Sequence, residues 1–377
     1  MRQLKKELLD KLVQCKDVSL TSVSKLAGYI ENEPGIKDFA PDEFAAIDPR
    51  DGSPVIYNSK RSKRPHDNKT DGSNDKKKSP LKPCPICNGT TTGIIDVADL
   101  SCGFTFINKN LFPCFYVKSG NHPDTVVYNN TVLNKNCAVP EGHHYLQWTS
   151  SIHDNDWHNM PVSDLAIVLK RAGALEQKLL LDNDTKMADT SKWHGGINTK
   201  GFVSIIKNYG APVGGSLSHG HQQITLSNII SRAALNNYNF QNQHKITFSD
   251  YMQKNNSKSL IIKEFETASL QVPYFMRRPY FAMLFVKNTD RRFLSDLSNN
   301  ELRDIAGGIK FMTSAYHRLL PKINREVAYN ILFHTGPGGG LYIEFLPFTQ
   351  ETGGMEQLGL WVCQGIARDC TNELKKY

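Results

Sequence analysis

The chain has 377 residues, of which 39% are hydrophobic and 10% aromatic, and its net charge is +8. This composition is typical of a globular protein with one large core or two ordinary ones. The sequence has no apolar run of bilayer length, which excludes a membrane span, and eight cysteines in so long a chain are not a disulfide framework. We therefore expect a cytoplasmic protein.

Residues 1–33 predict two short amphipathic helices, because leucines and valines recur at helical spacing with charged residues between them. We interpret residues 1–40 as a helical extension that docks on the rest of the fold. A helix-turn-helix would also fit this segment, although no residue in it singles out that reading. Residues 47–57 are strand-like.

Much of the positive charge lies between Lys60 and Lys82, among Asp, Asn, Ser and Gly residues. This mixture is typical of a solvated surface loop. A nucleic-acid partner is disfavoured, because no RNA- or DNA-binding signature with interleaved aromatic residues accompanies the charge. The loop leads into Cys84-Pro-Ile-Cys87, and this spacing favours a metal site or a redox pair in a reducing compartment.

The order helix, strand, glycine-rich turn and strand occurs twice in the chain. In the first copy, a helical pattern that begins near Ser163 is followed by a strand at 202–206 and a glycine-rich turn. In the second copy, Ser298 and Glu301 form a capping box before a helical pattern, and strand-like segments flank the glycine-rich residues 336–340.

We therefore expect two similar halves, residues 41–235 and residues 236–377, after the extension at 1–40. The two copies differ in their chemistry. Gly340 and Tyr342 stand where the first copy has a pair of histidines, so only the first copy is equipped for catalysis.

Residues 210–223 carry the strongest indication of function, because a glycine-rich turn runs directly into His219, His221 and Gln223. A neutral imidazole is a competent nucleophile toward phosphorus, and the backbone N–H groups of such a turn can hold phosphate oxygens. A nearby amide donor can stabilise the charge that develops. His221 is our candidate nucleophile, and the alternative is a His-Gly-His sequence at an ordinary strand edge.

Further segments of the chain agree with this one in order and spacing. They are residues 48–52, 61–65, 84–87, 110–113, 151–154, 329–330 and 343–347. Together, over roughly residues 47–365, these motifs resemble the galactose-1-phosphate uridylyltransferases and their relatives in the histidine-triad superfamily.

The resemblance implies an α+β fold of two histidine-triad-like halves, each an antiparallel sheet flanked by helices, and a homodimer. It assigns catalysis to His221 and Gln223. A backbone carbonyl at or near His219 should accept a hydrogen bond from the ring N–H of His221, and Gln223 should donate to a phosphate oxygen. Asn208 should brace the loop, and residues 214–216 should donate to the phosphates. The nucleotide-binding residues implied are Arg61, Arg64, Asn110, Asn208, Gly214, Gly215 and Ser216.

The resemblance also implies a bound metal ion. Its ligands would be Cys84, Cys87, His153 and His219. A set of two sulfur and two nitrogen ligands suits zinc and leaves no position for water, which makes the site structural. The metal would fix the position of the loop that carries His219 and His221. A metal-free pair of thiols is the alternative, and another histidine could replace the third ligand. These other candidates are His143, His144 and His158.

The implied reaction is attack of His221 on the α-phosphorus of a nucleoside diphosphate sugar, release of the sugar 1-phosphate, and transfer of the nucleotide to a second phosphate acceptor. The default substrates are UDP-glucose and galactose 1-phosphate. An ADP-sugar or dinucleoside polyphosphate phosphorylase is the close alternative. From another class, a zinc-stabilised nucleic-acid-binding protein without catalysis is the second alternative.

The chain departs from the family pattern at several positions. Leu111 stands where uridylyltransferases commonly have aspartate, which leaves the base open. Ser218 and Gly220 stand at positions where the family usually or often has proline, which predicts a looser turn. The second-half histidines that bind a metal in some members are missing here, although His334 remains.

Overall fold

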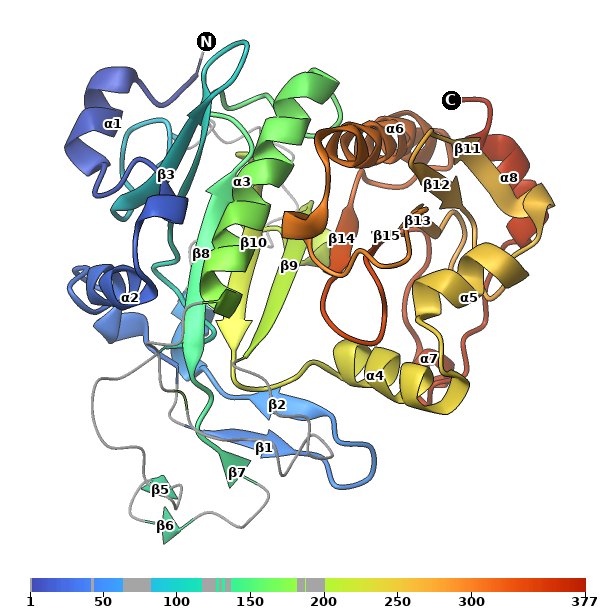
Figure 1. Ribbon diagram of the computed structural model, residues 1–377, viewed down its shortest axis with the longest axis horizontal. Coiled ribbons are helices and arrows are strands. Elements are labelled where there is room, and N and C mark those ends of the chain that lie inside the picture. Colours follow the sequence, from blue (N-terminus) through green and yellow to red (C-terminus); the bar gives the residue numbers. More distant parts are fainter. Residues whose placement is uncertain are drawn as a thin grey trace, which may run out of the picture.

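One sheet of ten antiparallel strands runs through the molecule (Figure 1). The structure is a computed structural model that describes residues 2–41, 44–63, 83–116, 127–128, 131–132, 137–181, 187 and 201–377. The helices are α1 Lys6–Leu12, α2 Val23–Glu31, α3 Val162–Leu181, α4 Arg232–His244, α5 Phe248–Asn255, α6 Asn299–Lys322, α7 Gly354–Gln357 and α8 Ala367–Leu374. Short 3-10 turns include η3 Ser59–Lys63, η5 Ala211–Val213 and η7 Leu294–Asp296.

The strands of the large sheet follow the order β11-β12-β13-β15-β14-β9-β10-β8-β4-β3. Their bounds are β3 Ile94–Asp99, β4 Phe104–Lys109, β8 Gly142–Trp148, β9 Phe202–Tyr209, β10 His221–Ser227, β11 Ile261–Glu264, β12 Ala268–Gln271, β13 Ala282–Val286, β14 Tyr329–His334 and β15 Tyr342–Pro347. One small sheet contains β1 Ala45–Ile47, β2 Pro54–Ile56 and β7 Cys137–Ala138. A second small sheet contains β5 Val127–Tyr128 and β6 Thr131–Val132.

Each half of the chain supplies five neighbouring strands and one long helix, so the α+β fold of two similar halves is confirmed. The helix α3 packs against β9 and β10, α6 packs against β12 and β13, and the two helices contact each other (Figure 1). The two five-stranded sheets are continuous, because β9 pairs with β14 along their shared edge. The expected boundary between residues 235 and 236 falls inside α4.

Local sequence signals fix where the second long helix begins. The Ser298 side chain accepts a hydrogen bond from the backbone N–H of Glu301, and the Glu301 carboxylate accepts one from the Ser298 N–H at 2.7 Å. This reciprocal capping box satisfies two N–H groups that the first turn of a helix leaves without partners. The predicted start of the helix is therefore confirmed, and its apolar face is buried against the sheet.

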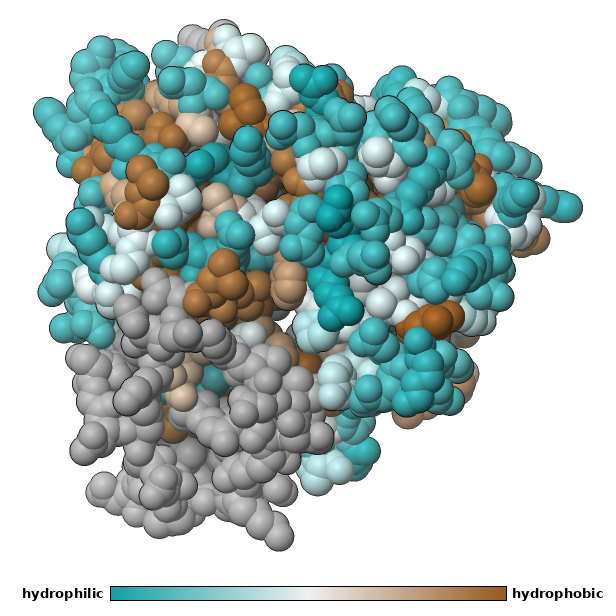
Figure 2. All heavy atoms as spheres, in the orientation of Figure 1, coloured by the Kyte–Doolittle hydropathy of each residue, from teal (hydrophilic) through white to brown (hydrophobic). Residues whose placement is uncertain are grey.

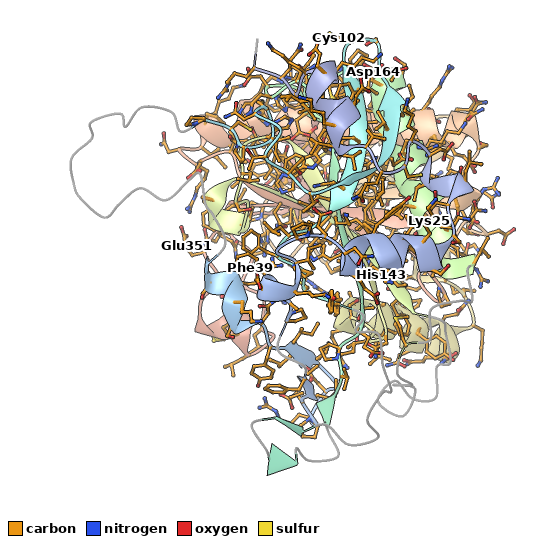
Figure 3. The ribbon with its side chains drawn as sticks, turned by 90° about the vertical axis from the view of Figure 1, so that its left-hand side faces the viewer. Lys25, Phe39, Cys102, His143, Asp164 and Glu351 are labelled. Carbon is orange, nitrogen blue, oxygen red and sulfur yellow. The ribbon has the colours of Figure 1, made fainter. Side chains whose placement is uncertain are left out.

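The N-terminal segment packs into the core of the first half. Leu4 donates its backbone N–H to Ser151, and Gln14 donates to Ile94 at the start of β3. Leu26 and Ile30, on α2, are buried in the same apolar cluster as the residues of α3. Figure 3, which looks onto this side and labels Lys25 on α2, shows α1 and α2 lying against the first half.

The described surface on the face drawn in Figure 2 is mostly hydrophilic, with apolar side chains gathered in smaller patches. None of the described helices has the length and hydropathy of a membrane span. Of the basic stretch at 60–82, residues 64–82 lie outside the described residues.

A buried carboxyl group links the two halves and predicts a pH-dependent stability. Glu176, on α3, is fully buried and accepts a hydrogen bond from the backbone N–H of Leu294 at 2.7 Å. Burial raises the pKa of Glu176 to about 7, above its value in the unfolded chain. The stability that this group contributes is therefore present in full at acid pH and is lost as the pH rises through about 7.

The glutamine of Glu176→Gln is neutral and has the same shape as the glutamate. As the pH rises from about 5 to about 8, we expect the free energy of unfolding of the wild type to fall by about 2–3 kcal/mol more than that of Glu176→Gln. Urea unfolding at both pH values measures this difference. Glu266→Gln, at an exposed position, is the matched control and should keep the wild-type dependence. Parallel pH profiles for the wild type and Glu176→Gln would show that the carboxyl is not protonated on folding.

Candidate active site and metal centre

The strand β10 presents two chemically different faces, because successive side chains of a strand alternate. Gln222, Ile224 and Leu226 point toward α3, where the two apolar residues join the main core. His221 and Gln223 lie on the opposite face and line a cavity. The predicted catalytic pair therefore shares one face of one strand.

This cavity has a volume of about 450 Å³, which is within the usual range for small-molecule sites. Four of the residues assigned from the sequence line it, and they are Asn110, Ser216, His221 and Gln223. Much of the rest of the wall is apolar and suits a flat ring. These apolar residues include Pro85, Ile86, Leu111, Phe112, Leu146, Trp148 and Leu217.

The geometry of His221 holds one tautomer of its ring. Its Nδ1 lies 2.9 Å from the backbone carbonyl oxygen of His219, which can only accept, so Nδ1 carries the proton. The lone pair of the neutral ring is then on Nε2. The Trp148 ring, in the cavity wall, lies 4.8 Å from the His221 ring between centroids. This is the tautomer that nucleophilic attack through Nε2 needs.

A buried ion pair supports the backbone at His221. Lys207 donates to the carbonyl oxygen of His221 at 3.1 Å and to the Asp156 carboxylate at 2.9 Å. Although burial alone would raise it, the Lys207 ammonium holds the pKa of Asp156 below its usual value. A Cβ at Gly220 would lie 2.5 Å from the Asp156 carboxyl carbon, so this position has no room for a side chain.

The turn is therefore packed rather than loose, in contrast to the expectation from the sequence. Gly220 accepts a hydrogen bond from the backbone N–H of Thr149 at 2.9 Å, and the Ser218 hydroxyl lies 3.3 Å from Nε2 of His153. Tertiary contacts at both positions take over the restraint that proline would supply.

The glycine-rich loop has a different use from the one predicted. The Gly214 N–H donates to Ala211 at 3.0 Å, and the Gly215 N–H donates to Gly210 at 2.9 Å. These donors are engaged within the loop, so we correct the prediction that they hold phosphate oxygens. Gly214 has a φ of 86°, a conformation that favours glycine, and a Cβ at Gly215 would lie 2.7 Å from the Gly210 carbonyl oxygen. The two glycines shape the turn, and Ser216 is the member of the predicted trio that lines the cavity.

Asn208 braces this loop through the second half of the chain. Its side-chain oxygen accepts a hydrogen bond from Asn330 at 2.7 Å, and the same Asn330 nitrogen donates to the carbonyl of Val213 at 3.1 Å. Asn208 is opposite Asn330 in the β9–β14 pairing. The junction of the two halves thus sets the position of the loop.

One of the two predicted arginines lies beside the turn at residues 110–113, and the other lies outside the described residues. Arg61, on η3, donates from its guanidinium to the carbonyl oxygen of Phe112, a residue of the cavity wall. It is not among the described residues that line the cavity, so its contact supports the turn. Arg64 lies outside the described residues.

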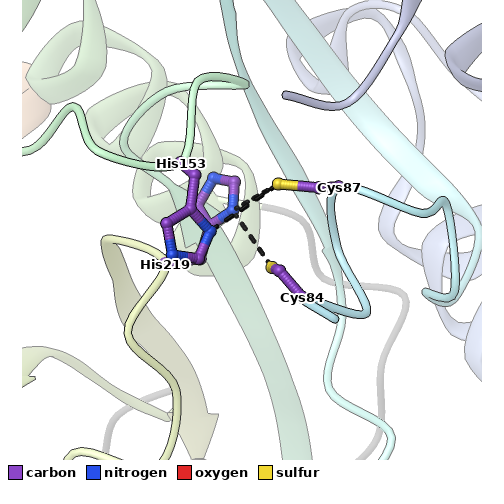
Figure 4. A group of neighbouring side chains, drawn as sticks. All are labelled: Cys84, Cys87, His153 and His219. Atoms are coloured by element: carbon purple, nitrogen blue, oxygen red, sulfur yellow. Dashed lines mark hydrogen bonds between the residues drawn. The ribbon is translucent and has the colours of Figure 1, made fainter. Parts of the chain in front are cut away.

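The four implied metal ligands come together at the base of the active loop (Figure 4). Their nearest ligand atoms all lie within 4.8 Å of one another. Cys84 Sγ is 3.6 Å from His219 Nδ1, and Cys87 Sγ is 3.6 Å from His153 Nδ1. Tetrahedral zinc with ordinary bond lengths separates sulfur and nitrogen ligands by about 3.5 Å, so the set fits zinc.

The histidine tautomers fit a metal as well. His219 lies with Nε2 2.8 Å from the Ser150 carbonyl oxygen, so Nε2 carries the proton and Nδ1 presents its lone pair to the two sulfurs. Burial lowers the pKa of His219 to about 4, which keeps the ring neutral. The alternative third ligands lie elsewhere: His143 contacts Tyr145, His144 contacts Gln223, and His158 stacks on His317.

Two residues of the site escaped the sequence analysis. His144 Nε2 lies 3.0 Å from Gln223 Oε1, and Glu33, from the N-terminal segment, lines the cavity while pairing with Lys109. The two adjacent histidines in β8 were visible only as possible metal ligands. Nothing in the sequence indicates that Glu33 reaches the cavity, because that depends on how the N-terminal segment packs.

The corresponding position of the second half is filled by protein. Tyr342 is buried, donates its hydroxyl to Asn237 on α4 at 3.1 Å, and stacks on His334 with ring centroids 4.3 Å apart. His334 in turn pairs with Glu344 at 3.0 Å. A Cβ at Gly338 would clash with the backbone of Tyr238, so α4 sits directly on this loop.

Comparisons with known proteins support the same family. No family model matches the chain. A galactose-1-phosphate uridylyltransferase from Haemophilus influenzae is 29% identical over 145 residues, which span 37% of this chain and 40% of that protein. The resemblance to the galactose-1-phosphate uridylyltransferase family is confirmed.

Solved structures with uridylyltransferase-like folds match most of the chain at 15% identity, which supports the fold alone. A uridylyltransferase structure covers 88% of this chain and 97% of its own, with a TM-score of 0.66. A galactose-1-phosphate uridylyltransferase-like protein from Arabidopsis thaliana covers 78% and 92%, with a TM-score of 0.60. An ADP-glucose phosphorylase from the same organism, with bound ADP-glucose, covers 88% and 98%, with a TM-score of 0.59.

Proposed function

We propose that this protein is an enzyme that transfers a nucleoside monophosphate from a nucleoside diphosphate hexose to a hexose 1-phosphate through a covalent nucleotidyl-histidine. One observation carries the proposal: His221, held with its proton on Nδ1, lines a cavity of about 450 Å³ together with Gln223. In the first step, His221 Nε2 forms a bond to the α-phosphorus and the bond to the bridging oxygen breaks. The hexose 1-phosphate leaves with that electron pair.

In the second step, a phosphate oxygen of the acceptor attacks the same phosphorus and the bond to Nε2 breaks, which restores the neutral ring. Gln223 would donate to a non-bridging oxygen as its charge develops. The apolar wall would hold the base, and Asn110 would contact it or the ribose. A site lined by apolar residues also limits the access of water, which favours transfer over hydrolysis.

We further propose that zinc binds to the cluster of four ligands. When bound there by Cys84, Cys87, His153 and His219, it would act as a structural anchor with no position open to substrate. His219 contributes one ring nitrogen to the cluster and its carbonyl oxygen to the His221 ring. The anchor would therefore fix the orientation of the nucleophile two residues later.

UDP-glucose and galactose 1-phosphate are the substrates we propose first. A specific observation favours the phosphorolysis of an ADP-sugar as the second candidate. Leu111, at the position where uridylyltransferases commonly have aspartate, is part of the apolar cavity wall. It would contact a larger base without supplying the carboxylate.

The homodimer is also a proposal. Large apolar side chains between residues 355 and 366 are exposed in the single chain, and a second copy would cover them. The exposed residues of this segment are Met355, Leu358, Leu360, Trp361, Val362 and Ile366.

Labelling with nucleotide sugars tests the proposed reaction and identifies the base. We expect incubation with UDP-glucose or ADP-glucose, each carrying phosphorus-32 at the α-position, to leave acid-labile, base-stable label on the protein, as a phosphoramidate should. A chase with galactose 1-phosphate that forms the new nucleotide sugar would identify a transferase. A chase with inorganic phosphate that forms the nucleoside diphosphate would identify a phosphorylase. No label from either nucleotide would contradict the proposed function.

A further inference from the structure

His144 occupies the cavity side of β8, next to the predicted phosphate donor. In the β8–β10 pairing it lies opposite Thr225, which places it diagonally across from Gln223. The residue is buried. His143, its neighbour in the chain and labelled in Figure 3, points to the other face of the sheet, where Nδ1 contacts the Tyr145 hydroxyl at 2.9 Å.

A backbone donor fixes the tautomer of His144. The N–H of Cys114 points at Nδ1 of His144 at 3.0 Å, and a backbone N–H can only donate. Nδ1 must therefore offer its lone pair, so the single proton of the neutral ring is on Nε2. The chain after β4 thus controls which hydrogen bond this ring offers to the active site.

Gln223 offers an acceptor for the Nε2 proton. Gln223 Oε1 lies 3.0 Å from Nε2, whereas Asn110 Nδ2, also at 3.0 Å, carries protons of its own. The orientation of the Asn110 amide is set independently, because its Oδ1 accepts the N–H of Phe112 at 2.9 Å. The Nε2 proton is therefore donated to Gln223, and this hydrogen bond engages the Gln223 oxygen.

We propose that His144 is a positioning residue that fixes the direction of the Gln223 amide, an inference that rests on the proposed function. The two ends of an amide have nearly the same shape and opposite polarity, so an unrestrained Gln223 could present its oxygen to the substrate. An oxygen would repel the phosphate, whereas the NH2 group donates to it. By binding Oε1, His144 leaves Nε2 of Gln223 as the amide atom that faces the cavity.

The same network gives the cavity a second donor with a fixed direction. In this tautomer His144 offers no lone pair to the Asn110 NH2 group, and we expect that group to donate to a bound nucleotide. Gln223 and Asn110 are far apart in the sequence and line the same cavity, and we expect both to offer their NH2 groups to a ligand there. A single ring, set by one backbone N–H, coordinates this arrangement.

Nucleotidylation under single-turnover conditions tests the proposal, with the nucleotide sugar that labels the wild type. We expect His144→Phe to lower the maximal rate about 10–100-fold, with little change in the concentration that gives half-maximal rate. His144→Gln, which can place an NH2 group where Nε2–H lies, should recover most of the rate. The matched control His143→Phe changes the adjacent buried histidine on the other face and should leave the rate near that of the wild type.

A double-mutant cycle separates positioning from a general structural effect. If His144 acts through the amide, His144→Phe should have no further effect on the rate in a Gln223→Ala background. An equal loss in both backgrounds would overturn the proposal, as would a wild-type rate for His144→Phe.

A measurement that does not depend on activity keeps this inference distinct from the proposed function. Nitrogen-15 NMR of the histidine-labelled full chain should show the Nε2–H tautomer for His144, assigned by loss of its signals in His144→Gln. A proton on Nδ1 would overturn the positioning role even if the enzyme is active. If the wild type takes no label from any nucleotide sugar, the proposed function fails, whatever tautomer His144 shows.

Discussion

Replacing His221 with alanine is expected to lower the rate of nucleotide transfer at least about 10⁴-fold, because the variant has no group that can carry the nucleotide covalently. The ring lines the cavity, and its backbone carbonyl, which Lys207 binds, is unchanged by the substitution. We therefore expect the variant to fold and to bind nucleotide. Steady-state transfer and covalent labelling measure the loss.

The control for this prediction is His244→Ala, which removes an exposed histidine at the end of α4 and should behave as the wild type. Circular dichroism and nucleotide binding should be the same in both variants. Transfer at more than about one hundredth of the wild-type rate in His221→Ala would assign the nucleophile to another group.

Loss of the proposed metal site should have the second largest effect. The apparent binding free energy of a structural zinc ion, about 10–16 kcal/mol, is comparable to the whole stability of a typical domain. Cys84 and Cys87 lie in the cluster with His153 and His219, and His219 is two residues before the proposed nucleophile. We expect Cys84→Ser to lower the zinc content from about one ion per chain to well below half, and to lower both the Tm and the transfer rate sharply.

Cys102→Ser is the matched control, because Cys102 is exposed and is not in the cluster (Figure 3). Plasma emission spectroscopy on the purified proteins gives the metal content, and calorimetry gives the Tm. An unchanged zinc content in Cys84→Ser would exclude Cys84 as a ligand. A wild-type protein that folds and reacts without any metal would contradict the anchoring role.

Local signals in the sequence predicted those parts of the fold that depend on neighbouring residues. The capping box at Ser298 and Glu301 specifies the start of α6 from two side chains and two backbone groups of one turn. The glycine-rich turn before His221 was predicted to lead into a strand, and in β10 the alternation of side chains then places His221 and Gln223 on the same face. The four proposed metal ligands come from three separate segments, and they were predicted through the family resemblance.

The features that sequence reasoning missed depend on tertiary contacts. The amide groups of Gly214 and Gly215 are used within their own loop, and only the folded path of that loop shows this. The tight packing of Gly220 depends on Asp156. The tautomer of His144 depends on the backbone N–H of Cys114, 30 residues earlier in the chain. No local pattern encodes these contacts.

Mass spectrometry of the protein after incubation with its nucleotide sugar can detect the covalent intermediate itself. The proposed mechanism requires that one nucleoside monophosphate is added per chain, that fragmentation places it on His221, and that galactose 1-phosphate or inorganic phosphate removes it. A reaction that proceeds with no adduct, or with the adduct on another residue, would contradict it.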